Sequence, residues 1–274
     1  MSILTVDDAK CTRCGFCVLE CPSRIIEQAD PKALPTLVED QVGRCITCGH
    51  CVSVCPFAAI ALRTMKPEDC TPVNKELLPT AEQVEHFLKS RRSIRAYKDE
   101  PVPGEILAKL IDIARYAPSG SNSQPVQWLV IEDRTEVRRL AALVIEWMNL
   151  LIKKSPGVIE LFHFDLFVNG WERGEDRVLR GAPHIIVAHA PKDTPMAQEN
   201  CSIALTYLEL AAYSQGLGAC WAGYLLAAAT SFPAMINALG LPGGHRCFGA
   251  MMVGYPKHKF KRIPLRNEPP IIWR

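Results

Sequence analysis

The sequence lacks the motifs that mark most nucleotide-binding enzymes and zinc proteases. It contains no G-x-x-x-x-G-K phosphate loop and no H-E-x-x-H motif. The nearest approach to a dinucleotide fingerprint, Gly216-Leu217-Gly218, has Trp221 where its last glycine would stand, and it follows a predicted helix instead of a strand. The formal net charge of +2 gives no argument for nucleic acid or an anionic membrane as a partner.

Signals for secretion or a membrane span are also missing. The N-terminal residues have neither the basic start nor the apolar run of a signal peptide. Residues 210–244 contain no Asp, Glu, Lys or Arg, but prolines and glycines interrupt them before the roughly 20 apolar residues of a membrane helix are reached. We therefore expect a buried core helix with turns here, and a soluble, cytoplasmic protein.

Cysteine, in contrast, is abundant and patterned. Eight of the twelve cysteines form two copies of C-x-x-C-x-x-C-x-x-x-C-P, offset by 34 residues. This run is typical of 4Fe–4S ligation. The first copy holds Cys11, Cys14, Cys17 and Cys21, and the second holds Cys45, Cys48, Cys51 and Cys55.

Other uses of these cysteines fit less well. Structural zinc sites usually separate their C-x-x-C pairs by about 15–20 residues. No C-x-x-C is followed by His, which excludes c-type haem attachment. A disulfide framework requires an oxidising compartment, and the sequence signals none. The remaining cysteines are expected to be free thiols: Cys70, Cys201, Cys220 and Cys247.

The cysteine-rich segment resembles a bacterial-type two-cluster ferredoxin over roughly residues 1–65. In such proteins the fourth cysteine of each run ligates the other cluster. The prediction is therefore two crossed ligand sets. One consists of Cys11, Cys14, Cys17 and Cys55, and the other of Cys45, Cys48, Cys51 and Cys21.

The remaining length is enough for a second domain with its own core. We expect a ferredoxin domain at 1–65, a proline-containing linker at 66–80 and a second domain at 81–274. Apolar periodicity predicts mixed helices and strands, and hence the α+β class. Helices are expected at 82–90, 105–116, 136–154, 198–214 and 234–239, strands at 126–131, 184–190 and 246–253, and an irregular aromatic segment at 155–181.

Two polar segments of the second domain are candidate binding sites. Arg91, Arg92, Ser93 and Arg95 form a compact donor cluster, and Arg side chains match phosphate oxygens well. The alternative is a solvated basic face at a helix end. Residues 117–125 are rich in hydroxyls and amides that could bind a polar heterocycle, although the same composition is typical of an ordinary turn.

Taken in order, these segments resemble the FMN-dependent nitroreductase family over residues 85–265. The matching motifs are Arg91-Arg92-Ser93-Ile94-Arg95, Pro118-Ser119-Gly120-Ser121-Asn122-Ser123-Gln124-Pro125, Gly216-Leu217-Gly218 with Gly223, and Gly254-Tyr255-Pro256 followed by Arg262-Ile263-Pro264. Two positions depart from the family pattern. Val126 stands where many relatives have an aromatic residue, and Phe260-Lys261-Arg262 replaces the usual Lys-x-Arg, so that Lys259 or Lys261 is left to supply the lysine.

The resemblance implies an intertwined homodimer with FMN at the subunit interface. The motif implies that the FMN phosphate or ribityl chain is held by Arg91, Ser93 and Arg95, which form one cluster with Arg92. A second basic contact to the phosphate would come from Arg262. A backbone amide near Gly223 faces the flavin ring. The partner subunit supplies Ser119, Asn122 and Gln124.

Together the two halves predict an oxidoreductase. Clusters carry single electrons, and a flavin handles one or two, so electrons pass from cluster to cluster to FMN and then to a small-molecule acceptor such as a nitro compound or quinone. External ferredoxin or NAD(P)H is the expected donor, and the aromatic residues from Phe162 to Trp171 are a candidate substrate lid or a plain surface loop. The alternatives are a module that passes electrons to a protein partner and a redox sensor. A redox sensor would be expected to carry a DNA-binding or kinase segment, and the sequence shows none.

Overall fold

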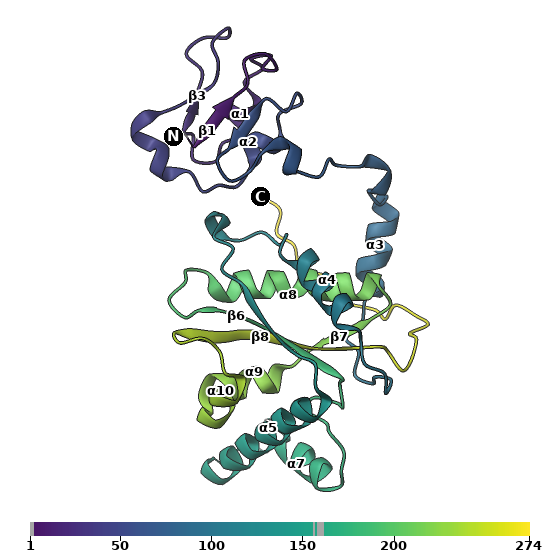
Figure 1. The fold of residues 1–274 in the computed structure, drawn as a ribbon. Helices are drawn as coiled ribbons and strands as arrows, with labels where there is room; N and C mark the ends of the chain where they lie inside the picture. Colours follow the sequence, from purple (N-terminus) through teal and green to yellow (C-terminus); the bar gives the residue numbers. More distant parts are fainter. Residues whose placement is uncertain (1–2, 156, 158–161) are drawn as a thin grey trace. The chain divides into compact units, whose positions relative to one another are not determined.

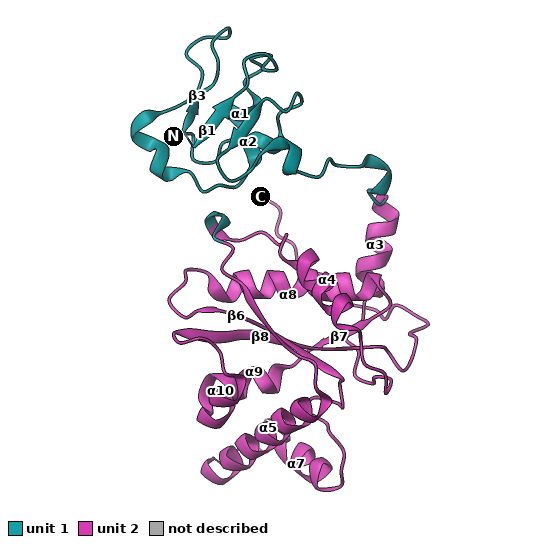
Figure 2. Cartoon of the chain, viewed as in Figure 1, with its two compact units in different colours: residues 1–79, 121–123 teal, residues 80–120, 124–274 magenta. Residues whose placement is uncertain are grey.

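The computed structural model describes residues 3–155, 157 and 162–274. The chain forms two compact units (Figure 2). Unit 1 comprises Met1–Pro79 with the short segment Ser121–Ser123, and unit 2 comprises Thr80–Gly120 and Gln124–Arg274. Among the described residues, no helix is both long and apolar enough to cross a membrane.

Unit 1 is built from two small antiparallel strand pairs and two single-turn helices (Figure 1). Its elements are β1 (Leu4–Val6), α1 (Phe16–Leu19), β2 (Ile26–Glu27), β3 (Thr36–Leu37), η1 (Glu39–Arg44), α2 (His50–Ser53), β4 (Ile60–Leu62), η2 (Pro67–Asp69) and η3 (Lys75–Leu77). Strand β1 pairs antiparallel with β4, and β2 with β3. The structure preserves the internal repeat, because α1 and α2 each begin after a glycine with positive φ, 74° at Gly15 and 75° at Gly49.

Unit 2 contains a four-stranded sheet with the order β5-β6-β8-β7, in which every neighbouring pair is antiparallel. The strands are β5 (Gln127–Ile131), β6 (His184–Pro191), β7 (Gly218–Trp221) and β8 (His245–Gly254). The helices are α3 (Ala81–Ser90), α4 (Gly104–Ala114), α5 (Arg134–Lys154), α7 (Phe164–Glu172), α8 (Ala197–Ser214), α9 (Gly223–Ser231) and α10 (Pro233–Leu239), with the turn η4 at Gly120–Asn122.

Helices cover both faces of this sheet (Figure 1). Along β6, Ile185 and Val187 belong to the core shared with α5, α7, α9 and α10, while Ile186 and Ala188 belong to the core shared with α4 and α8. Successive residues of a strand point to opposite faces, so a strand buried on both sides is apolar at nearly every position. This explains why β6 appears in the sequence as a continuous apolar run.

Most predicted elements are confirmed, but two segments differ from expectation. Residues 155–181, expected to be irregular, contain α7, in which Phe164 and Val168 lie four residues apart and are both buried. Residues 210–244, expected to be one buried helix with turns, contain the end of α8, the strand β7 and the helices α9 and α10. In both segments many aromatic or small side chains weaken the periodic contrast on which the prediction depended.

Candidate functional site

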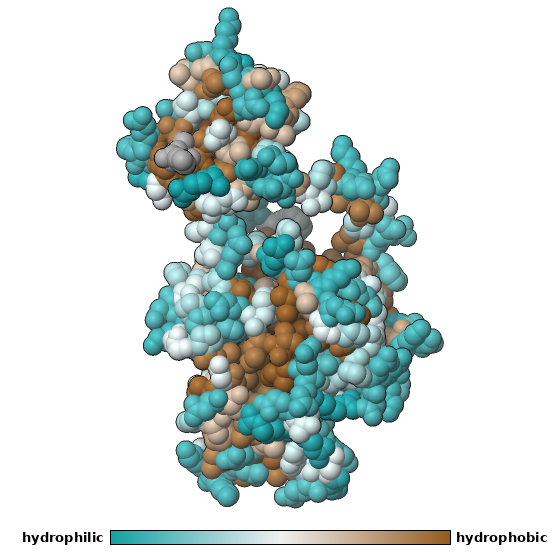
Figure 3. Space-filling view, in the orientation of Figure 1, coloured by the Kyte–Doolittle hydropathy of each residue, from teal (hydrophilic) through white to brown (hydrophobic). Residues whose placement is uncertain are grey.

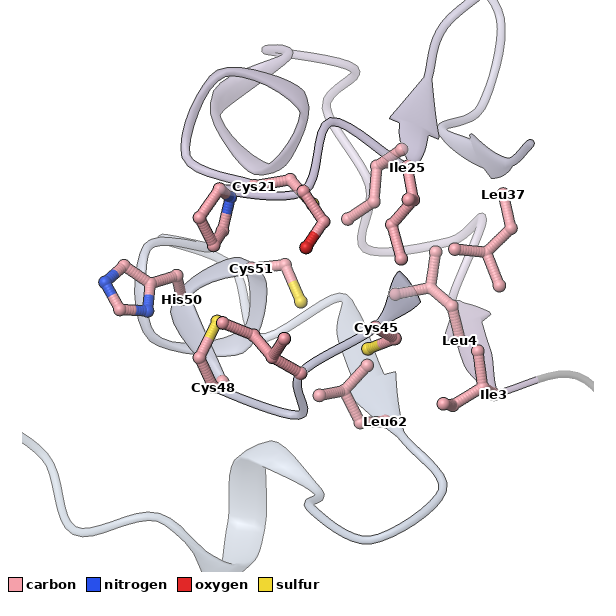
Figure 4. A pocket seen from close by; sticks show the side chains of 15 residues that line it. Ile3, Leu4, Cys21, Ile25, Leu37, Cys45, Cys48, His50, Cys51 and Leu62 are labelled. Carbon is pink, nitrogen blue, oxygen red and sulfur yellow. The ribbon is translucent and has the colours of Figure 1, made fainter. Parts of the chain in front are cut away.

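The eight motif cysteines of unit 1 lie around two separate pockets. Cys21, from the first repeat, lines one pocket with Cys45, Cys48 and Cys51 from the second. Figure 4 shows this pocket, with Ile25, Leu37 and Leu62 among its apolar walls. The other pocket is lined by Cys11, Cys14, Cys17 and Cys55. Each pocket thus combines three cysteines of one repeat with the fourth of the other.

The surroundings of these thiols are largely apolar. Burial raises the pKa of Cys51 to about 11, and its cysteine neighbours Cys48, Cys21 and Cys45 add to the shift. Burial likewise raises the pKa of Cys17. Thiolates are the ligand form of cysteine, so a positively charged group must compensate these burial costs. Within the described residues, no three His, Cys, Asp or Glu side chains converge on a point that would hold a single metal ion.

In unit 2 the segment Arg91–Arg95 runs in extended form beside β7. The Ile94 backbone N–H donates to Ala219 O at 2.9 Å. Gly218 permits this approach, because a Cβ there would lie 2.2 Å from Ile94 Cγ1. In an extended segment alternate side chains point in opposite directions. Accordingly, Arg92 and Ile94 line one cavity, whereas Arg95 lines another.

Arg91 is held by a carboxylate that the sequence did not point to. Its Nη1 lies 2.8 Å from Glu209 Oε1 on α8. Burial raises the pKa of Glu209, and the Arg91 guanidinium opposes that shift. A second contact strengthens the same junction, since Ser90 Oγ and Tyr213 Oη are 2.8 Å apart. Arg91 therefore joins the end of α3 to α8.

The cavity at Arg95 measures about 560 Å³ and combines cations with aromatic rings. Arg95 and Arg180 line it together with Cys220, Trp221 and Gly223. The other walls come from α5, α7 and α9 and include Trp147, Phe162, Phe164 and Tyr224. Burial raises the pKa of Cys220, while Arg95, Arg180 and a hydrogen bond from Ser93 oppose that shift.

A second cavity of about 540 Å³ begins at the other end of β7, next to Gly216 and Leu217. It is strongly basic. Its charged walls are Arg92, Lys98, Lys257, Lys259, Lys261 and Arg262, accompanied by His86 and His258. Arg92 and Arg262, which are far apart in the sequence, therefore share one site, and both lysines considered for the C-terminal motif lie in it.

The polar loop takes a tightly turned conformation. Ser119 Oγ accepts from the Gln124 N–H at 2.9 Å, and Asn200 Oδ1 accepts from the Gly120 N–H at 3.0 Å. Asn122 belongs to unit 1, where its Nδ2 donates to Ile46 O at 3.1 Å and Thr47 O at 3.3 Å. Ser119, Asn122 and Gln124 line neither of the two cavities of unit 2.

Sequence reasoning missed three residues of this region: Arg180, Glu209 and Cys220. None belongs to a motif, and each reaches the site only through the fold. The sequence offered one signal for two of them, because Arg180 and Glu209 are charged residues within or next to apolar stretches. Glu209 interrupts an apolar stretch of α8, and Arg180 directly precedes the segment that leads into the buried strand β6.

Comparison with known proteins places both units. Residues 10–60 match the 4Fe-4S dicluster domain, and residues 88–255 match the nitroreductase family. An iodotyrosine deiodinase from Thermotoga neapolitana is 26% identical over 66% of this chain and 91% of its own length. An NADH dehydrogenase from Thermus thermophilus is 29% identical over 67% of this chain and 92% of its own length.

Solved structures share the fold of unit 2. A nitroreductase with bound FMN from Bacteroides fragilis aligns with a TM-score of 0.57 and 22% identity, covering 70% of this chain and 99% of its own. An oxidised iodotyrosine deiodinase bound to FMN and 3-iodo-L-tyrosine gives 0.54 and 23%, covering 70% and 98%. With more than half of its residues matched, this chain belongs to the nitroreductase family and carries a 4Fe-4S dicluster domain ahead of the nitroreductase domain.

Proposed function

We propose that this protein is an FMN-dependent oxidoreductase that takes up single electrons through two 4Fe–4S clusters and reduces a small organic acceptor, such as a nitro compound or a quinone. The observation that carries the proposal is the presence, in one chain, of two crossed cysteine pockets and a nitroreductase domain with a basic and an aromatic cavity. When bound, FMN supplies chemistry that links one-electron carriers to two-electron reduction.

The two cavities of unit 2 offer surroundings suited to different chemical groups of FMN. The basic cavity suits a phosphate, with Arg92 and Arg262 as its principal donors and Lys259 or Lys261 beside them. The other cavity suits a flat ring, and Arg95 offers hydrogen bonds to the polar edge of that ring. The Gly223 N–H lies at the start of α9, where amide groups lack partners within the helix.

Arg91 and Gly223 would shape the flavin site without donating a side-chain hydrogen bond to FMN. Arg91 is engaged by Glu209 and orients the segment that carries Ser93 and Arg95. The open space around the Cβ position of Gly223 leaves room for a ring to approach the backbone. The aromatic side chains Trp147, Phe164 and Tyr224 exclude water and give a flat acceptor a surface on which to stack.

The crossed pockets of unit 1 support the ligand sets expected for two clusters. Cys11, Cys14 and Cys17 with Cys55 would hold one, and Cys45, Cys48 and Cys51 with Cys21 the other. A single tetrahedral zinc would draw its four ligands to one point, whereas the cysteines here surround a pocket. Cluster charge would offset the burial of Cys51 and Cys17.

We further propose that the protein works as an intertwined homodimer. Ser119, Asn122 and Gln124 would complete the flavin site of the partner subunit, which accords with their absence from the cavities of their own subunit. Apolar side chains gather on the surface over the middle of unit 2 (Figure 3). Such a surface often marks an interface between proteins.

An anaerobic titration tests the function. The holoprotein is mixed with reduced ferredoxin and, separately, with NADH, and the flavin band is followed by absorbance. We expect ferredoxin to bleach the band and a nitroaromatic compound to restore it with consumption of that compound. If the band stays unchanged with both donors, the relay is wrong. If it is bleached but no small acceptor restores it, electrons leave to a protein partner instead.

A further inference from the structure

The two cysteine repeats of unit 1 differ at three positions that matter for access. The first repeat carries Phe16 and Leu19, and Phe57 follows the Cys55-Pro56 pair. With the 34-residue offset, the equivalent residues are His50, Ser53 and Ser23. Phe16 and Phe57 thus line one pocket with Leu19 beside it, whereas His50 and Ser23 line the other with Ser53 beside it. Two further pairs run the opposite way, because the exposed Thr12 and Glu20 of the first repeat correspond to the less exposed Ile46 and Val54 of the second.

The three apolar residues lie on the surface around one cysteine set. Phe16 and Phe57 line the pocket of Cys11, Cys14, Cys17 and Cys55, and Leu19 lies one helical turn after Phe16. Their exposed fractions are 48% for Phe16, 82% for Leu19 and 53% for Phe57. Cys14 is the exposed member among the cysteines of the described chain, so one corner of this site reaches the solvent within an apolar rim.

At the other cysteine set, the residues equivalent to Phe16, Leu19 and Phe57 are polar. His50 points away from the pocket in Figure 4, and Ser23 Oγ donates to Arg44 O at 2.9 Å. Cys48, the equivalent of Cys14, is half-buried. Access from solvent is therefore unequal at the two sites.

Two cations next to the apolar rim are paired within the chain. Lys10 lies 3.2 Å from Asp7, and Arg13 pairs with Asp8. A partner at this surface would thus meet an apolar patch beside paired cations and the exposed carboxylate of Glu20. Exposed apolar groups rimmed by polar residues mark interaction sites, and small transient redox interfaces need only a limited area.

We propose that the surface formed by Phe16, Leu19 and Phe57 is the docking face for a small one-electron carrier protein, and that electrons enter the chain at the site of Cys11, Cys14, Cys17 and Cys55. The inference rests on the proposed function. A carrier protein fits better than a pyridine nucleotide, because a nucleotide delivers a hydride, and the cations beside the face that a pyrophosphate would need, Lys10 and Arg13, are engaged by Asp7 and Asp8.

Two encounters with the carrier protein balance the electrons of one acceptor reduction. In each, the carrier would lose one electron, and a cluster held by Cys11, Cys14, Cys17 and Cys55 would accept it. Two encounters supply the two electrons of one acceptor reduction, and solvent supplies the protons. No bond is formed between the carrier and this chain.

The test replaces the three apolar residues of the docking face with the equivalent residues of the other repeat. Phe16→His, Leu19→Ser and Phe57→Ser give the first site the residues of the second, and Ser53→Leu is the matched control at the second site. Binding of a purified two-cluster ferredoxin to each holoprotein is measured by calorimetry, and its electron delivery by anaerobic stopped flow. Iron and sulfide content and reduction by dithionite report on the clusters themselves.

We expect Leu19→Ser, at a residue outside the lining of the cysteine pocket, to bind ferredoxin more weakly and to be reduced more slowly, with unchanged cluster content and dithionite reduction. The triple variant should bind ferredoxin at least about tenfold more weakly than the wild type. The Ser53→Leu control should match the wild type. If the triple variant loses its clusters, Leu19→Ser alone, at the most exposed position of the three, decides the question by the same binding measurement.

Unchanged ferredoxin binding in the variant would overturn the proposal, as would a wild type that binds no ferredoxin although dithionite reduces its flavin. In both cases the proposed function would stand. A lower oligomeric state of the variant in sedimentation would instead assign the face to a second copy of this chain and would also overturn it.

Discussion

Arg91, Arg92 and Arg95 are close neighbours in sequence, yet each faces different surroundings. Arg91 pairs with Glu209, Arg92 lines the basic cavity, and Arg95 lines the aromatic one. The extended conformation of the segment sends Arg92 to the opposite side from Arg91 and Arg95, and the four-residue separation places Arg91 and Arg95 at different points along the same side. The three guanidinium groups of this motif therefore lie in three different surroundings, and their roles in FMN binding stay a prediction.

The role of Arg95 can be measured directly. Replacing Arg95 with Ala should weaken FMN binding by about 1.5–3 kcal/mol, the value of a hydrogen bond to a charged group. The dissociation constant is obtained by fluorescence titration of the apoprotein. Arg115→Ala is a matched control, because Arg115 is exposed and pairs with Asp112 at 2.7 Å outside both cavities. Equal affinity in Arg95→Ala and the control would remove Arg95 from the site.

Cys21 tests the crossed arrangement of the cysteines. Because Cys21 lies with Cys45, Cys48 and Cys51, Cys21→Ser should damage the cluster of the second repeat and spare that of its own repeat. Electron paramagnetic resonance of the reduced protein separates the two signals. Cys70→Ser serves as control, since the Cys70 thiol lies in neither set and donates to Lys66 O at 3.3 Å. Loss of only the first-repeat signal would contradict the crossed sets.

At the scale of elements, β7 is a short strand on which both cavities depend. Gly218 and Ala219 hold the segment Arg91–Arg95, and Trp221 reaches the aromatic cavity. Gly218→Ala should displace Ile94 and destabilise unit 2 by about 1–3 kcal/mol, with loss of FMN retention. Urea unfolding measures the change. Gly243→Ala, at a position with nothing within 4 Å of the added Cβ, should leave stability close to the wild type, and equal midpoints would contradict the argument.

Strand β6 carries two buried imidazoles that should make stability depend on pH. His184 Nε2 accepts from the Val102 N–H at 2.8 Å, and His189 Nδ1 lies 2.9 Å from His245 Nδ1. Burial lowers the pKa of both His184 and His189 below the usual 6.5. As pH falls below about 6.5 the unfolded chain gains protons first, so the free energy of unfolding decreases.

Urea unfolding at pH 7.5, 6.5 and 5.5 measures this dependence. His189→Asn should reduce the loss of stability between pH 6.5 and 5.5, because one of the two shifted groups is gone. Stability that rises as the pH falls through this range would show that the sign is wrong.

How far the sequence predicts this molecule depends on the distance over which each signal acts. Cysteine spacing and the turn at Gly15 are local, so the cluster motifs could be recognised directly. The partner of Arg91 could not be predicted, because Glu209 is 118 residues away and comes into contact only when α8 packs beside α3. Helix α7 was missed for a different reason, since its aromatic residues Phe164 and Phe167 obscure the periodicity and pack on Tyr224.

At the scale of the whole molecule, each unit carries one part of the proposed chemistry. Unit 1 gathers thiols around two small pockets, and unit 2 gathers cations and aromatic rings around two larger cavities. The chain therefore keeps the electron carrier and the flavin enzyme at a high local concentration, which a mixture of separate proteins would lack. The proposed homodimer would add a second requirement, because part of the proposed flavin site would come from the partner subunit.

The C-terminal residues offer the clearest test of the homodimer. Residues 264–274 have no helix or strand, and their large apolar side chains are open to solvent in the single chain, with Leu265 97% exposed and Trp273 87% exposed. Burial of such side chains is strongly favourable, so we expect them to pack on a second subunit. Deletion of residues 264–274 should shift the protein from dimer to monomer in sedimentation velocity and lower its FMN content.

A second variant keeps the length of the chain and removes only the apolar side chains of the tail. Leu265→Ser combined with Ile272→Ser and Trp273→Ser should weaken the dimer in the same direction, because the lost contact is apolar and not a backbone strand. The matched control is Arg266→Ala, which leaves those apolar side chains in place and should not weaken the dimer. If the deleted protein sediments as a stable dimer with full FMN, the tail does not hold the subunits together, and the interface must then lie on the apolar surface over the middle of unit 2.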